Sequence, residues 1–305
     1  MEALISILVI YFFIVLGFAA KKIFKNEIEE KSLILISIYF LQPILTFWGL
    51  TRTKINYDLI LTPFVYFITV TVTLVCLMLI SNSIFKNKKD RSIFISTGLI
   101  GNTGNLAIPL GIALFGMESV PFTSIINIAN IFFIYTIGIY FLAREKYTFK
   151  QSIISMAKIP ILWFAIFAMI FNYLNLSIIP EIDKALEMGA YSTIVLQLII
   201  FGIYLAKVGF KINNFKLTFF TSIAKLLLLP AVGILISISF GLSPFIASIL
   251  VISLATPLAV NNVNLAALYD CKPLDVTSII LFSTISFLVL FYFLLQAVHL
   301  IFGGL

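Results

Sequence analysis

Side-chain amides and hydroxyls gather in two otherwise apolar segments of this 305-residue chain. Each cluster lies close to a proline, Pro109 in the first segment and Pro257 in the second. A carboxamide offers two hydrogen-bond donors and an acceptor, so either cluster could bind the backbone of a broken helix together with a small polar ligand. The predicted site residues of the two clusters are Asn102, Thr103, Asn105, Thr256, Asn261, Asn262 and Asn264.

A proline break within a membrane helix adds a reason to expect anion binding. Proline lacks an N–H and opens the helix, and in hydrocarbon the freed backbone groups must bind protein, water or ligand. The half-helix after the break begins with free N–H groups and a partial positive charge, which favour a carboxylate. The structural alternative is that Gly and Pro are common in membrane helices and that Asn joins neighbouring helices.

The composition is that of a membrane protein. Hydrophobic residues make up 61% and charged residues 11%, and the mean hydropathy is +1.14. Soluble domains are about 25% charged, so the composition excludes an ordinary soluble enzyme, a disordered protein and a nucleic-acid-binding domain. Two cysteines without a CxxC spacing and a single histidine, His299, give no basis for a disulfide framework or a metal site. We expect no metal and no cofactor.

Ten apolar runs are long enough to cross a bilayer core about 30 Å thick. The first lacks a basic leader and a small-residue cleavage site, so we expect a retained helix and not a signal peptide. Together the runs predict an all-α polytopic protein without a sizeable soluble domain. They lie near 3–20, 32–50, 59–80, 93–116, 121–143, 159–176, 189–206, 218–240, 245–268 and 275–302.

Basic residues predict the orientation of these spans. Alternate connecting segments hold 17 of the 20 Lys and Arg residues, and the other set holds only Arg52, Lys54 and Lys184. Connections rich in Lys and Arg stay in the cytoplasm. The sequence therefore predicts a multi-pass protein of the cell membrane with both termini outside.

The ten spans divide into two predicted repeats of five, residues 1–150 and residues 151–305. An odd number of spans per repeat gives the two halves opposite orientations. The interrupted runs, 93–116 and 245–268, are the fourth of each half. Matched interruptions in corresponding spans point to a transporter binding site, formed here where spans 4 and 9 are predicted to cross.

Two motifs resemble the auxin efflux carrier family, which includes the plant PIN auxin exporters and bacterial carriers described as malate or malonate permeases. They are Asn102-Thr-Gly-Asn105-Leu-Ala-Ile-Pro109 and Ala-Thr-Pro257-Leu-Ala-Val-Asn-Asn. The Gln42-Pro43 pair and the spacing from Tyr269 to Pro273 are also similar. The resemblance implies a scaffold of spans 1, 2, 6 and 7, a transport domain of spans 3–5 and 8–10, an elevator motion and a homodimer formed through the scaffold.

The resemblance also assigns roles by position. Asn102 matches the residue that hydrogen-bonds the substrate carboxylate in plant members, and Pro109 and Pro257 match the prolines of the crossover. Plant members carry a Lys-Glu pair where this chain has Ala267 and Leu268, and their long loop between spans 5 and 6 is missing here. We therefore expect a ligand smaller and more polar than auxin, such as a short mono- or dicarboxylate.

Other polar residues within the spans have two interpretations each. Gln42 is predicted to form one wall of the site, although contact between helices would explain it and Gln197 equally well. Asn127 and Asn130 are predicted to be packing residues. Lys225 lies about 10 Å inside its run. We favour an interpretation in which it extends to the cytoplasmic interface, with attraction of an anion as the alternative.

The predicted function is secondary transport of small organic anions, by efflux or facilitated diffusion. No Asp or Glu lies deep in a predicted span, which argues against a proton relay. Sodium- or proton-coupled symport and an anion channel on the same scaffold are the alternatives. An intramembrane enzyme lacks a catalytic motif and ATP drive lacks a P-loop, while a receptor without transport would need a partner chain for signalling. The expected partners are a carboxylate, the bilayer and a second copy of the chain, with no nucleic acid.

Overall fold

The computed structural model describes residues 2–52, 54–143, 150–151, 154, 157–207, 212–259 and 261–303, without the side chains of residues 2–10, 207, 261 and 264. Every regular element in this part of the chain is a helix, which confirms the predicted all-α class. Three basic residues used for the orientation, Arg144, Lys146 and Lys211, lie outside the described residues.

Six described helical segments are long and apolar enough to cross a membrane, so the chain is a multi-pass membrane protein. They are Glu30–Thr51, Tyr57–Ile84, Met117–Ala143, Pro180–Ala206, Phe215–Ser239 and Pro273–Phe302. Each covers one of the expected runs, except that run 218–240 ends one residue beyond Ser239. The helix that contains run 189–206 begins well before it, at Pro180, because Glu181, Asp183 and Lys184 extend the helix beyond the apolar stretch.

The remaining four expected runs are also helical. The first is α1 (Glu2–Phe24), and run 159–176 is the shorter α10 (Pro160–Tyr173). Run 93–116 divides into α5 (Lys88–Thr97) and α6 (Ile108–Phe115), and run 245–268 divides into α14 (Pro244–Ala255) and α15 (Asn261–Leu268). The remaining helices are α2 (Glu30–Ile36), α3 (Gln42–Thr51), α4 (Tyr57–Ile84), α7 (Val120–Phe133), α8 (Ile139–Ala143), α11 (Pro180–Lys207), α12 (Phe215–Ile223), α13 (Leu229–Ser239) and α16 (Pro273–Phe302).

Four of the long helical paths contain a five-residue π-helical turn. These turns are Ser37–Leu41 between α2 and α3, Thr103–Ala107 before α6, Ile134–Gly138 between α7 and α8, and Ala224–Leu228 between α12 and α13. Such turns are frequent at functional sites. Thr103–Ala107 directly follows one of the helix breaks described below, and α7 and Ala224–Leu228 contact Thr103–Ala107 and α14 respectively. Gln42, which follows Ser37–Leu41, lies near Gly104.

Asparagine side chains fix the beginnings of two corresponding spans. The Oδ1 atom of Asn56 accepts a hydrogen bond from the Leu59 backbone N–H at 2.8 Å, and α4 begins at the next residue. The Oδ1 atom of Asn214 likewise accepts from the Leu217 N–H at 3.1 Å, directly before α12. These are N-caps, which satisfy backbone donors that the first turn of a helix leaves free.

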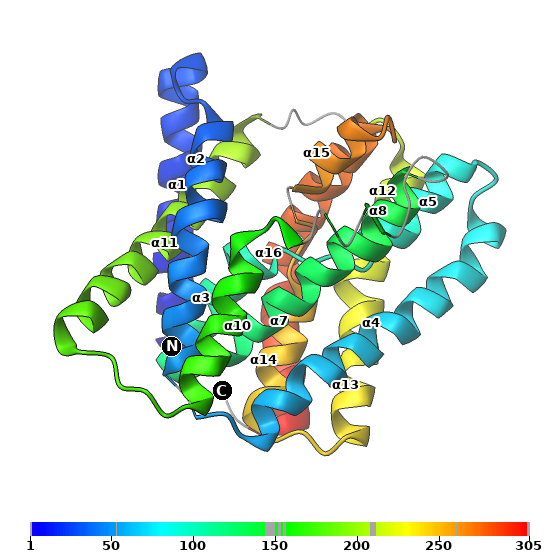
Figure 1. Ribbon diagram of the computed structural model, residues 1–305. Helices are drawn as coiled ribbons and strands as arrows, with labels where there is room; N and C mark the ends of the chain where they lie inside the picture. Colours follow the sequence, from blue (N-terminus) through cyan, green and yellow to red (C-terminus); the bar gives the residue numbers. More distant parts are fainter. Residues whose placement is uncertain are drawn as a thin grey trace.

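The helices form two groups that can be followed in Figure 1. Helices α1, α2, α3, α10 and α11 lie together toward the left, and the second group is α4, α5, α8 and α12 to α16, of which α14 and α16 lie in the middle of the view and the others to the right. Within the first group α1 packs against α11, and α3 packs against α10 and α11. The groups meet through α7, which contacts both α3 and α4, and through the contact of α1 with α6.

Glycines bring α1 and α11 together so closely that their backbones touch. A Cβ atom added to Gly17 would overlap the Ile199 carbonyl group, and one added to Gly202 would overlap the carbonyl group of Ile14. Small residues allow this approach, which replaces the hydrophobic effect as a source of association between membrane helices.

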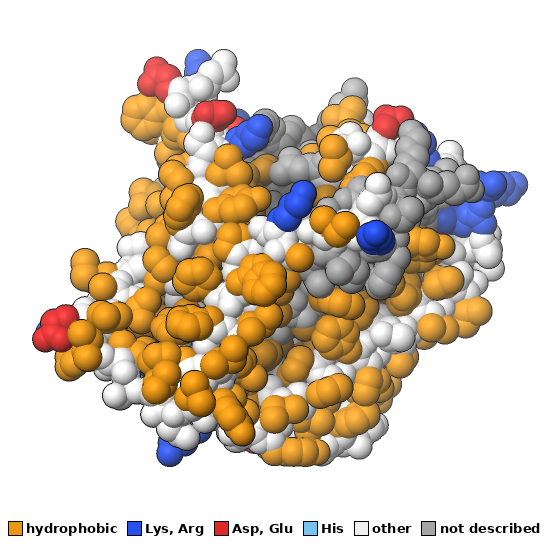
Figure 2. Space-filling view, viewed as in Figure 1, with side chains coloured by type: hydrophobic (Ala, Val, Ile, Leu, Met, Phe, Trp, Pro, Cys, Tyr) orange, Lys and Arg blue, Asp and Glu red, His pale blue; other side chains and the backbone are white. Residues whose placement is uncertain are grey.

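Most of the visible surface is apolar. Figure 2 shows hydrophobic side chains over much of the visible face, with acidic and basic side chains toward its margins and some basic side chains in its upper middle. At one end of the bundle Arg52 Nη2 pairs with Asp183 at 2.9 Å. At the opposite end Lys89 pairs with Asp270 at 3.3 Å and Lys272 pairs with Asp90. Each pair joins segments predicted to share one side of the membrane, and which end faces the cytoplasm stays a prediction.

Candidate functional site

The two interrupted segments meet at their breaks. Gly101 and Leu258 form an isolated antiparallel bridge, and the Asn102 backbone N–H donates to the Pro257 carbonyl oxygen at 2.9 Å. These contacts bring the two predicted motifs together although they are more than 150 residues apart in the chain. The breaks therefore satisfy part of each other's backbone, as burial in a membrane protein requires.

Pro257 explains why α14 ends at Ala255. The residue before it, Thr256, is extended, with φ −56° and ψ 144°, as expected because a proline ring disfavours the helical conformation in the residue that precedes it. The Thr256 hydroxyl donates to the Ser253 carbonyl oxygen at 2.7 Å and closes the last turn.

The first break depends on a glycine and not on its proline. Pro109 is the second residue of α6 and lies beyond the break, which spans residues 98–102. A Cβ atom on Gly101 would lie only 2.8 Å from Thr256 Oγ1, so the absence of a side chain permits the two breaks to touch. Pro109 follows the π-helical turn Thr103–Ala107, and its assignment to the crossover stays a prediction.

A cavity of about 270 Å³ lies beside this contact. One wall comes from the first break and from α7, and the other comes from the segment that joins α2 to α3. Its apolar lining includes Ile38, Ile131 and Ile134. Its amide and hydroxyl lining consists of Gln42, Asn102, Thr103, Asn105, Asn127, Asn130, Tyr39 and Tyr135.

Four predicted site residues therefore share one cavity, namely Gln42, Asn102, Thr103 and Asn105. Pro109, Thr256, Pro257 and Asn262 are buried near the breaks but do not line it. Thr256 and Pro257 hold the contact between the breaks, and the Asn262 side-chain amide donates to the Ala259 carbonyl oxygen at 2.8 Å. The side chains of Asn261 and Asn264 lie outside the described residues.

A buried hydrogen-bond network holds the first break in place. Asn130 Nδ2 donates to the Gly101 carbonyl oxygen and to Thr103 Oγ1, each at 2.9 Å. Thr103 Oγ1 donates to Asn127 Oδ1 at 2.8 Å, and the Tyr66 hydroxyl donates to Asn130 Oδ1 at 2.9 Å. Buried networks in which each member has a partner make one arrangement of the site specific.

The sequence analysis predicted that Asn127 and Asn130 are packing residues, but in the structure they do more than pack helices together. They line the cavity and bind the break. Their spacing of three residues on one helix face is the signal that could have indicated a shared role. Tyr66 was not singled out at all, because a tyrosine in an apolar run carries no pattern that distinguishes it.

The side-chain amide of Asn102 has unused hydrogen-bond donors. The side chain is buried, and its Nδ2 atom has no hydrogen-bond partner among the described residues. A buried polar group without a partner costs about 1–3 kcal/mol. A ligand in the cavity that accepts from this amide would remove that cost, whereas the Asn102 backbone already binds Pro257, Leu106 and Ala107.

Lys225 does not extend to the interface, so that interpretation was wrong. Its side chain is 0% exposed, and Nζ donates to the carbonyl oxygen of Leu254 in the last turn of α14. The physical reason is that the C-terminal carbonyl groups of a helix carry partial negative charge, which offers the ammonium group a partner inside the protein.

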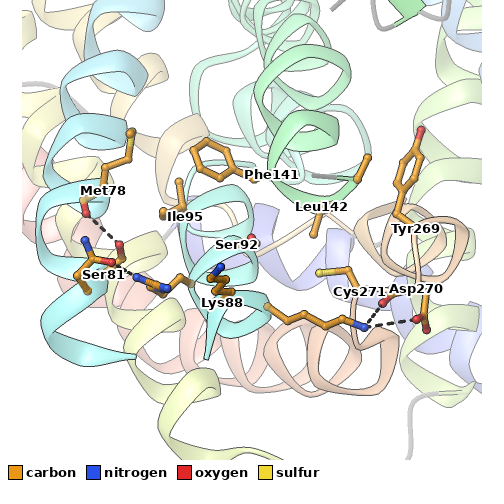
Figure 3. Close-up of a pocket in the computed structure, with 14 residues that line it drawn as sticks. Met78, Ser81, Lys88, Ser92, Ile95, Phe141, Leu142, Tyr269, Asp270 and Cys271 are labelled. Carbon is orange, nitrogen blue, oxygen red and sulfur yellow. Dashed lines mark hydrogen bonds and ion pairs between the residues drawn. The ribbon is translucent and has the colours of Figure 1, made fainter. Parts of the chain in front are cut away.

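A larger cavity of about 640 Å³ lies at the end of the bundle where Lys89 pairs with Asp270 (Figure 3). Lys88, Lys89 and Arg91 contribute cationic groups to its lining. Lys89 Nζ donates to the Asp270 carbonyl oxygen at 2.8 Å, and Arg91 donates to Asn82 Oδ1. No predicted site residue lines this cavity, and two of its three cationic groups already have partners, so the smaller cavity is the candidate site.

Replacing Thr103 with valine is expected to destabilise the protein by about 1–3 kcal/mol, because Asn127 Oδ1 and Asn130 Nδ2 would each lose a buried partner. Thr123→Val is the matched control, since the Thr123 hydroxyl donates to the backbone carbonyls of Ser119 and Val120, in the preceding turn, and not to another side chain. Thermal unfolding of both purified variants measures the difference. Equal destabilisation of the two would contradict a role for the network.

Comparison with known proteins gives two matches. A family profile described as "Membrane transport protein" matches residues 2–295. A protein of Methanocaldococcus jannaschii described as an uncharacterized transporter is 25% identical over 295 residues, which cover 93% of this chain and 95% of that protein.

Proposed function

We propose a function from the premise that this chain belongs to the membrane transport protein family, the family of auxin efflux carriers that its two motifs resemble. Membership makes the chain a membrane transporter, and both matches point away from an enzyme. The proposal is that it is a secondary carrier of small organic anions, which bind in the cavity beside the two helix breaks.

The observation that carries this proposal is the unpaired, buried amide of Asn102 in the cavity lining. The first N–H groups of the helical segment that begins at Thr103 have no partner within that segment, and they lie at the same break. The described lining contains amides and hydroxyls but no Asp or Glu. Donors without an opposing carboxylate favour an anion, and the small volume favours a short mono- or dicarboxylate.

The proposed architecture is a ten-span inverted repeat of residues 1–150 and 151–305, in which spans 4 and 9 cross at their breaks. The bridge between Gly101 and Leu258 supports the crossing. The grouping of α1, α3, α10 and α11 supports a scaffold of spans 1, 2, 6 and 7. The cavity lies between this group and the breaks, where an elevator motion would alternate its access, and a second copy would bind through the scaffold.

Transport is proposed to follow the substrate gradient and the membrane potential across the cell membrane, with both termini outside. An anion that leaves the negative cytoplasm gains about 2.3 kcal/mol per charge per 100 mV. The alternatives are coupled symport and a channel. In liposomes, a carrier exchanges labelled for unlabelled substrate faster than it releases substrate without exchange. A channel shows unitary currents and no such exchange.

Asn102→Ala is expected to weaken carboxylate binding about 10- to 100-fold, because a hydrogen bond to a charged group is worth about 1.5–3 kcal/mol. The measurement is the thermal shift of the purified protein with acetate, succinate and benzoate. A ligand at a hundred times Kd stabilises the folded state by about 2.7 kcal/mol.

The matched control is Asn213→Ala, an exposed asparagine outside the helices. It should leave the shift unchanged. If Asn102→Ala binds as tightly as the wild type, the site is assigned wrongly. If no carboxylate shifts the wild type, anion transport itself is contradicted.

A further inference from the structure

Lys225 is a buried cation near the middle of the 25-residue apolar helix Phe215–Ser239. It lies in the π-helical turn Ala224–Leu228, where one extra residue changes the directions of the side chains relative to a continuous α-helix. Charged side chains inside membrane helices are rare and face the protein interior when they have a function.

The ammonium group lies close to both helix breaks. Nζ binds the Leu254 carbonyl group at the end of α14. A Cβ atom added to Gly101 would lie 3.1 Å from Nζ and 3.3 Å from Cε. Thr256 Oγ1 lies 2.8 Å from that same position. One charge therefore binds the end of one broken helix and lies near the glycine at which the other is broken.

The charge of Lys225 has no carboxylate partner in the described part of the chain. The ion pairs found there lie near helix ends and join Lys21 to Glu30, Arg52 to Asp183, Lys89 to Asp270, and Lys272 to Asp90 and Asp275. A carbonyl dipole at a helix end compensates only part of a full charge. In a buried, weakly polarisable environment the remainder acts over several ångströms.

Lys225 does not line the cavity itself, but its ammonium group lies close to a residue that does. Gly101 lines the cavity together with Asn102, and a Cβ atom added to Gly101 would lie 3.1 Å from Lys225 Nζ. A carboxylate bound in the cavity would supply the missing negative charge. Backbone carbonyl and hydroxyl oxygens such as those of Leu254 and Thr256 are also groups that a hard cation such as Na⁺ accepts, and here the ammonium group already occupies their side of the breaks.

We propose that Lys225 is a tethered counter-cation that determines charge selectivity: it takes the place of a co-bound sodium ion and makes the cavity select anions without one. The inference rests on the proposed transport of organic anions and adds the positioning residue that sets the charge of the site.

The test compares Lys225→Met, which keeps the length and removes the charge, with Lys225→Arg, which keeps the charge. The probe is the tightest-binding of acetate, succinate and benzoate, titrated by thermal shift in sodium chloride and in choline chloride. Wild-type affinity should agree within about twofold between the salts. Lys225→Met should bind at least about tenfold more weakly, a loss of about 1.4 kcal/mol, and Lys225→Arg should stay closer to the wild type.

A purely structural role gives a different result. If Lys225 only caps α14, Lys225→Met lowers the unfolding temperature of the ligand-free protein but leaves the affinity unchanged, which overturns the proposal. Sodium-dependent binding by the wild type also overturns it, and that measurement needs no variant to fold. If the wild type binds none of the three carboxylates, the proposed function itself is contradicted. That result is distinguishable from a failure of the Lys225 proposal, because it is seen without any variant.

Discussion

Replacing Gly101 with alanine is expected to separate the two helix breaks and to lower transport at least about tenfold. The new methyl group would lie 2.8 Å from Thr256 Oγ1 and 3.1 Å from Lys225 Nζ. Both neighbours are buried and held by hydrogen bonds to α14, so the backbone of the first break has to move. Overpacking of this kind costs about 1–3 kcal/mol, and thermal unfolding together with uptake into liposomes would measure both effects.

The control for this variant is Gly138→Ala. Its methyl group would meet Ile100 Cδ1 at 2.9 Å, the flexible end of a side chain that can turn away. We expect a smaller loss of stability and nearly normal transport. If Gly101→Ala transports as well as Gly138→Ala, close contact between the breaks is not needed for function.

Gly202→Ala is expected to be the most destabilising single methyl addition in the first helix group. The added group would overlap the Ile14 carbonyl and approach the Phe18 backbone N–H, and a backbone cannot turn away as a side chain can. Helices α1 and α11 would have to move apart along their shared face. We expect a loss at or above the usual 1–3 kcal/mol of overpacking, about 3 kcal/mol, measured by unfolding in mixed detergent micelles.

Gly189→Ala lies in the same helix, α11, and serves as its control. The added methyl group would meet Ile44 Cγ2 at 2.8 Å, and that side chain can adjust. A drop in the unfolding temperature clearly larger for Gly202→Ala supports the close packing of α1 on α11. Equal drops would show that the two backbones do not touch in the folded protein.

The sequence predicted those features that depend on composition and local breaks. Apolar runs indicate where helices cross a membrane, because an approximate span length is required in any topology. Clustered amides beside Pro257 identified a real interruption, and Gln42, Asn102, Thr103 and Asn105 share one cavity.

Features that depend on the direction of a side chain, or on which helices pack together, could not be predicted in this way. The depth of Lys225 along its helix follows from counting residues, but whether it faces a neighbour or the interface depends on a π-helical turn that the sequence does not indicate. Asn127 and Asn130 became site residues only when α7 was placed against the first break. The sequence also does not indicate which residue of the first motif breaks the helix, because Gly101 lies in the break and Pro109 lies beyond it.

The π-helical turns have a consequence for how the length of this chain can vary. Each holds one residue more than the α-helix that would replace it, so deleting a single residue could leave the helix intact. The side chains beyond the deletion would then keep their present directions, because only the extra residue of the π-helical turn is lost. A deletion in a regular α-helical stretch instead rotates all later side chains by about 100° around the helix axis. At Ser37–Leu41 the loss of one residue would leave Gln42 directed at the cavity. One-residue deletions should therefore be tolerated better in these turns than elsewhere in the spans.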